Sequence, residues 1–140
     1  MFKYYFQSPN FNEPYDGIFY GIMISLGFAA VENIMYVYQS GFAVGVLRMF
    51  TAVPAHAMFG AIMGYYFGLA WQKPELKSKL MLKGLFSAIL LHGAYDFFLL
   101  QENYPGLMFV SFLGLFLTWK LVLKAIQAHN DASPFKNENL

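Results

Sequence analysis

Four ionisable side chains interrupt the long apolar stretches of this sequence: Glu32, His56, His92 and Asp96. An ionisable side chain in the middle of a membrane costs about 2.5–3.5 kcal/mol on insertion scales, so each should have a partner or a function. His92 and Asp96 are four residues apart, which places both on one face of a helix. This spacing suits two metal ligands, or one ligand and the carboxylate that orients it.

The chemistry of these four residues points to a metal-dependent hydrolase. Two imidazoles and two carboxylates provide nitrogen and oxygen ligands that suit Zn²⁺ and leave one position for water. The chain has no cysteine, so thiolate ligands and a cysteine nucleophile are excluded. We expect His56, His92, Asp96 and Glu32 to surround the metal. Within this group we expect Glu32 and His92 to be catalytic, with Glu32 as the general base that takes a proton from water.

The same residues also allow structural interpretations. His92 and Asp96 could form a buried pair that fixes helix packing, and a protonated Glu32 could hydrogen-bond to a neighbouring helix. Two carboxylates could also activate water without a metal if one were neutral and one ionised. We interpret Arg48 as a side chain that reaches the external membrane boundary, and His129 as part of a polar tail.

A stripe of small residues accompanies His56 along one helical face. Gly60, Gly64 and Gly68 follow it at four-residue steps. Glycines at this spacing let another helix approach closely, so the stripe predicts a contact between helices and not a surface facing lipid.

The elements that must position these residues are long apolar helices. Hydrophobic residues make up 58% of the chain and charged residues only 12%, against about a quarter charged in soluble domains. We therefore predict an all-α, polytopic membrane helix bundle of about four transmembrane helices. The predicted spans are residues 17–38, the later part of 42–71, 84–100 and 107–123. A net charge of +1 without a basic cluster excludes a nucleic-acid surface.

The lysines predict the orientation of this bundle. They concentrate in the segment 73–83, predicted as a solvated loop, and from Lys120 onward. In a four-helix topology both segments lie on one side, which the positive-inside rule makes cytoplasmic, together with the amino terminus. We expect residues 1–126 to form the membrane-embedded domain and 127–140 a polar, disordered cytoplasmic tail.

The pattern FxxxE falls on Phe28 and Glu32, followed by Asn33, and the pattern HxxxD falls on His92 and Asp96. These two motifs resemble those of the PrsW family of membrane proteases, which is related to the CAAX-processing endopeptidases. The similarity covers roughly residues 11–100. It implies proteolysis of a membrane-embedded or membrane-proximal substrate, such as an anti-sigma factor, in a bacterial cytoplasmic membrane.

The family's EExxK motif has no counterpart, because the sequence contains no consecutive acidic pair. We therefore expect the chain to begin after the family's helix that carries the EExxK motif. If the paired glutamates supply the general base in the family, Glu32 becomes a metal ligand or a supporting residue.

Three functions remain open. The first is a membrane metalloprotease with Zn²⁺ as cofactor, membrane lipid as its surroundings and a membrane protein or peptide as substrate. The second is a non-catalytic module that binds other transmembrane helices through the stripe of His56 and the glycines. The third is a proton or ion relay, which is disfavoured because no internal repeat is present.

Overall fold

The computed structural model describes residues 8–136, and within them every regular element is helical. The elements are α2 (Pro14–Ser40), α3 (Phe42–Phe50), α4 (Ala52–Gln72), the 3₁₀ turn η1 (Pro74–Leu76), α5 (Lys77–Leu99), the 3₁₀ turn η2 (Pro105–Leu107) and α6 (Met108–Asp131). The expected all-α bundle is confirmed. Residues 1–7 and 137–140 lie outside the described part of the chain.

Local sequence explains where α2 begins and ends. Pro14 occupies its first turn, and Glu13 and Asp16 form a reciprocal capping box that satisfies free backbone N–H groups. The helix ends at Ser40, and the next residue, Gly41, has a φ of 89°, which suits a residue without a Cβ. This turn folds α3 back against α2.

The glycine stripe of α4 packs against α2 within this chain. A Cβ on Gly60 would lie 2.6 Å from the carbonyl oxygen of Gly21, and one on Gly64 would lie 2.6 Å from the Cα of Ile18. Real Cβ atoms do not approach that closely, so glycine is required for these two backbones to touch. The predicted contact between helices exists, and its partner is α2.

The segment 42–71 forms two helices where we expected one in its later part. Helices α3 and α4 meet at Thr51 and are bent by 43° from each other. Pro54 lies in the first turn of α4, a position that proline tolerates. By length and composition the described chain has three helices able to cross a membrane, or four when the bent pair counts as one span.

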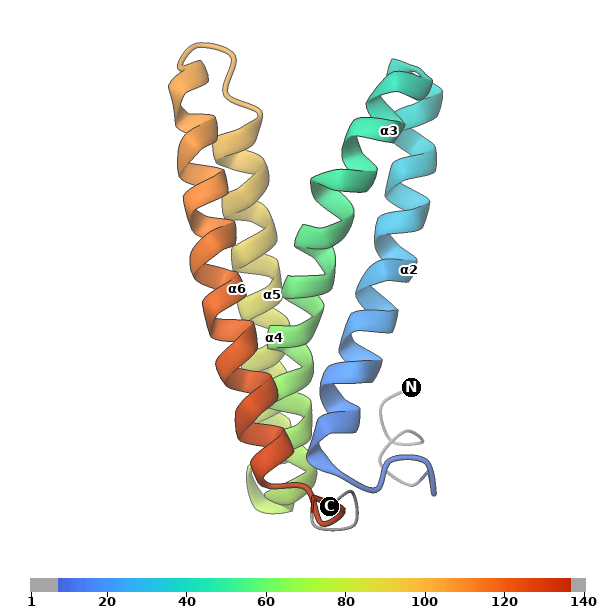
Figure 1. Cartoon of the computed structure of the whole chain (residues 1–140), viewed down its shortest axis with the longest axis vertical. Helices are drawn as coiled ribbons and strands as arrows, with labels where there is room; N and C mark the ends of the chain where they lie inside the picture. The colour runs from blue at the N-terminus through green and yellow to red at the C-terminus, as the bar shows by residue number, and fades with distance from the viewer. Residues whose placement is uncertain (1–7, 137–140) are drawn as a thin grey trace.

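The helices form two arms that meet at one end (Figure 1). Helices α2 and α3 lie in one arm and α5 and α6 in the other, while α4 contacts all four of them. Two serines fix neighbouring backbones: Ser25 Oγ donates to the carbonyl of His56 at 2.7 Å, and Ser111 Oγ donates to that of Tyr95 at 2.8 Å.

Two helices extend beyond the predicted spans. Helix α5 begins at Lys77, inside the segment expected to be a loop, and only Lys73 to Leu76 separates it from α4. Helix α6 continues to Asp131, so residues 127–131 are helical although we placed them in a disordered tail. His129 is buried there, and its Nε2 lies 2.9 Å from the Tyr65 carbonyl oxygen. Amphipathic helix ends that carry lysines are hard to separate from solvated loops by composition alone.

Candidate metal centre

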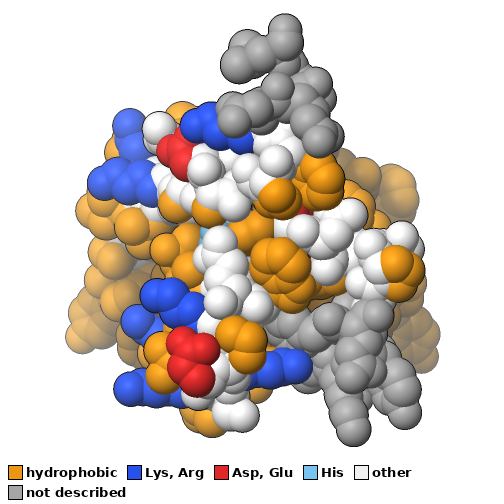
Figure 2. Space-filling view, turned by 90° about the horizontal axis from the view of Figure 1, so that it is seen from below, with side chains coloured by type: hydrophobic (Ala, Val, Ile, Leu, Met, Phe, Trp, Pro, Cys, Tyr) orange, Lys and Arg blue, Asp and Glu red, His pale blue; other side chains and the backbone are white. Residues whose placement is uncertain are grey.

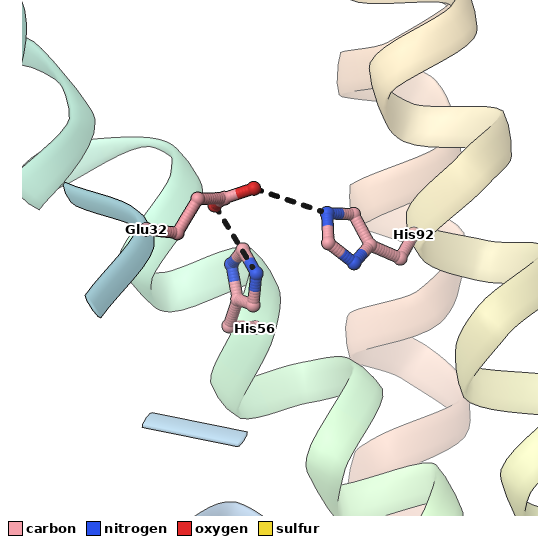
Figure 3. A group of neighbouring side chains, drawn as sticks. All are labelled: Glu32, His56 and His92. Atoms are coloured by element: carbon pink, nitrogen blue, oxygen red, sulfur yellow. Dashed lines mark ion pairs between the residues drawn. The ribbon is translucent and has the colours of Figure 1, made fainter. Parts of the chain in front are cut away.

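Three helices bring Glu32, His56 and His92 together at one point of the bundle (Figure 3). The Nε2 of His56 lies 3.5 Å from Glu32 Oε2, and the Nε2 of His92 lies 3.9 Å from Glu32 Oε1. One potential ligand atom from each residue lies within 4.8 Å of the others. This spacing is compatible with one shared ion, given ligand bonds of about 2.0–2.2 Å.

The backbone of α4 sets the orientation of His56. Its Nδ1 lies 2.8 Å from the carbonyl oxygen of Ala52, one turn earlier in the chain. The carbonyl can only accept, so Nδ1 donates to it and Nε2 is the ring nitrogen that faces Glu32. A carbonyl on the far nitrogen is the usual means of fixing a metal-binding imidazole. The residue is almost completely buried.

Asp96 lies beside His92 and not in the centre of the group. Its Oδ2 is 3.0 Å from His92 Nε2, as expected for residues four apart on α5. The two atoms form an ion pair by distance, but their geometry is not that of a directional hydrogen bond. The predicted residues Glu32, His56 and His92 thus converge, with Asp96 at their edge.

Arg48 belongs to this site, although the sequence interpretation placed it at the membrane boundary. Its Nη2 forms an ion pair with Glu32 Oε2, and its guanidinium lies 3.7 Å from the centroid of the Tyr36 ring. The side chain is only 12% exposed. The sequence signal for this role was an arginine within an apolar stretch. Its pairing with Glu32 could not be predicted, because it depends on the packing of α3 against α2.

Aromatic rings enclose the two histidines. Phe28 stacks on His56 with ring centroids 5.7 Å apart, and Phe59 stacks on His92 at 6.0 Å. The two imidazoles themselves meet edge to face at 4.6 Å. These contacts restrict rotation of both rings and surround the polar atoms with a low-dielectric environment.

The residues present fit a zinc ion. The Nε2 atoms of His56 and His92 are buried without hydrogen-bond partners, which is costly for polar atoms unless something else binds them. Both face a carboxylate, and two imidazoles with one carboxylate form a known ligand set of catalytic zinc.

Comparison with known proteins identifies the family of the chain. The model of the family described as "PrsW family intramembrane metalloprotease" matches residues 1–123. Curated relatives named "Protease PrsW" include one from Shouchella clausii, 38% identical over 125 residues, which span 86% of this chain and 58% of the relative. The relative from Geobacillus kaustophilus is 35% identical over 137 residues, 96% of this chain and 59% of the relative.

The Bacillus subtilis relative of the same name is 38% identical over 122 residues, 86% of this chain and 56% of its own length. The chain thus spans somewhat more than half the length of the curated relatives that it matches. No solved structure matches it. Since the family model covers most of the sequence and the helices suit membrane crossing, the chain is an integral membrane protein that belongs to the PrsW family of intramembrane metalloproteases.

Proposed function

We propose that Glu32, His56 and His92 hold a zinc ion and that this chain contributes that centre to peptide-bond hydrolysis within or next to a membrane. The observation that carries the proposal is that two buried Nε2 atoms without a hydrogen-bond partner face one carboxylate from different helices. When bound, zinc would polarise a peptide carbonyl and make water a better nucleophile at neutral pH.

The protein's own groups prepare the centre for this ion. The Ala52 carbonyl keeps the His56 proton on Nδ1 and leaves Nε2 free to bind. Arg48 holds one oxygen of Glu32, while the other oxygen, Oε1, faces His92. The Arg48 charge also offsets the carboxylate charge in an environment where an isolated charge is expensive.

We assign the proton-accepting role to Asp96 and a ligand role to Glu32. Arg48 already binds one oxygen of Glu32, and both imidazoles face this carboxylate, an arrangement that suits a metal ligand. Asp96 lies 3.0 Å from His92 Nε2, at the edge of the proposed metal position, and its side chain is 36% exposed. It can therefore take up a proton from water at the edge of the centre.

The substrate that suits this location is a membrane protein or peptide. Helices α2, α5 and α6 expose many large hydrophobic side chains, which lipid would cover. We place the chain in a bacterial cytoplasmic membrane, with the end of the bundle that carries the lysines in the cytoplasm.

Metal content tests the proposal directly. The chain purified in detergent without chelators should contain close to one zinc per molecule by elemental analysis, and His92→Ala should lose most of it. His129→Ala is the matched control, because it removes a buried histidine that contacts Tyr65 and not the centre. Absence of metal from the unaltered chain, or equal loss in both variants, would contradict the proposed ligands.

Hydrolysis needs a separate assay. The zinc-loaded chain reconstituted with a membrane-protein substrate should cleave it, and Asp96→Asn should reduce the rate while retaining metal. Zinc binding without any cleavage would favour a non-catalytic membrane module. The glycine stripe of α4 does not favour that alternative, because α2 already occupies it.

A further inference from the structure

A second feature lies away from the metal centre, in a groove between α4 and α6. The groove encloses about 360 Å³ and is lined by Ile62, Tyr65 and Tyr66 of α4 and by Leu121, Lys124 and Ala125 of α6, with Ala128 at its margin. Its lining is mostly apolar and includes no acidic side chain. The two arms of the bundle meet in this region, close to the α4–α5 connection.

We expect this groove to lie at the depth of a membrane interface. Tyr66 lies six residues before the end of α4 at Gln72, or about 9 Å along the helix axis. Tyrosine is enriched at that depth because its ring is apolar and its hydroxyl can reach the polar headgroups. Stacking on the buried His129 ring, 4.7 Å away, fixes the position of Tyr65.

One ammonium group lines the groove, and a second contacts the ring of a residue that lines it. Lys124 lines it directly, and Lys83 of α5 places its Nζ 4.9 Å from the centroid of the Tyr66 ring. Neither lysine forms an ion pair with an acidic side chain between residues 8 and 136. Figure 2, which looks onto this end of the molecule, shows Lys and Arg side chains in groups near its edge.

We propose that this groove, defined by Tyr65, Tyr66, Leu121 and Lys124, binds an anionic phospholipid. An acyl chain would lie along the apolar wall of α6, and the phosphate would meet the ammonium groups of Lys83 and Lys124. Charge complementarity selects the ligand, because a lipid with a zwitterionic headgroup neutralises its own phosphate and gains less from two unpaired lysines. A lipid bound there would contact α4, α5 and α6 at the end of the bundle where the two arms meet.

Lipid-dependent binding to the full chain in detergent micelles tests this site. Native mass spectrometry should show that phosphatidylglycerol binds more tightly than phosphatidylcholine of the same acyl composition. We expect the apparent affinity for phosphatidylglycerol to fall about fivefold with Lys83→Gln or with Lys124→Gln, and further in the double variant. Inorganic phosphate added alone should not displace the lipid, since it lacks an acyl chain.

Lys120→Gln is the matched control. Lys120 is one turn before Lys124 on α6, but its Nζ lies 5.3 Å from the Phe116 ring centroid and outside the groove. Its substitution removes the same charge and should leave the phosphatidylglycerol preference intact. Equal affinity for the two lipids, a preference that survives the double variant, or an equal loss in Lys120→Gln would each overturn the proposed site. Circular dichroism of each variant checks that the helices remain folded.

Discussion

At the scale of single residues, the decisive contact is the one between Arg48 and Glu32. The pair is largely shielded from solvent, with 12% and 19% of the two side chains exposed. Removal of one partner from a buried ion pair leaves a charge without compensation and costs about 3–5 kcal/mol when burial is complete. Arg48 is therefore expected to stabilise the bundle and to fix the Glu32 carboxylate.

Replacement of Arg48 tests that role. We expect Arg48→Gln to weaken zinc binding about 10–100-fold, the usual range when a residue that orients a ligand is lost. Arg48→Lys should recover part of the affinity, because it keeps the charge but loses the flat contact with Tyr36. Zinc titration with a competing chelator measures both values. Tighter binding by Arg48→Gln would show instead that Arg48 competes with the metal for Glu32.

The sequence singled out Glu32, His56 and His92, which the structure brings together, because each is an ionisable group within an apolar stretch. It did not predict the Arg48 contact, since Glu32 and Arg48 are 16 residues apart and meet only because the chain turns at Gly41. Nor did it predict the burial of His129, which depends on a helix end that looks polar by composition. The types of these residues could be interpreted from the sequence, whereas their contacts across helices could be identified only from the fold.

At the scale of the helices, the contact between α2 and α4 holds the bundle together. The spacing of the glycines predicted a close helix contact, but spacing alone could not identify α2 as the partner. Gly17 and Gly21 of α2 approach Gly64 and Gly68 of α4 backbone to backbone, so the contact has no room for a side chain. Because Glu32 and His56 lie on these two helices, their separation depends on this packing.

Alanine substitution of two glycines of α2, one inside this contact and one outside it, tests the contact. Gly21→Ala would place a Cβ 2.8 Å from the Cα of Gly64, so the helices must separate at a cost of about 1–3 kcal/mol. Gly27→Ala is the matched control on the same helix, since its Cβ meets nothing within 4 Å. Thermal unfolding in detergent should show a lower melting temperature for the first variant and an equal or higher one for the second. Similar losses in both would argue against a specific contact.

At the scale of the whole molecule, the fold places the α4–α5 connection and the end of α6 together. His129 near the end of α6 contacts the Tyr65 carbonyl of α4, so these two ends must lie on one side of the membrane. The connection between α5 and α6 lies at the other end of the bundle (Figure 1). The lysine distribution predicts that the side with the α4–α5 connection faces the cytoplasm.

Labelling of single cysteines in bacterial cells tests this topology, and the absence of native cysteine removes any background. A membrane-impermeant maleimide should label Glu102→Cys, at the α5–α6 connection, in intact cells. It should label Glu75→Cys and Asn130→Cys only after permeabilisation, because both exposed positions lie at the end with the lysines. A result in which Glu75→Cys and Asn130→Cys differ would contradict the fold. Reversal of all three labelling results would agree with the fold but contradict the predicted orientation. It would place the proposed phospholipid groove in the outer leaflet.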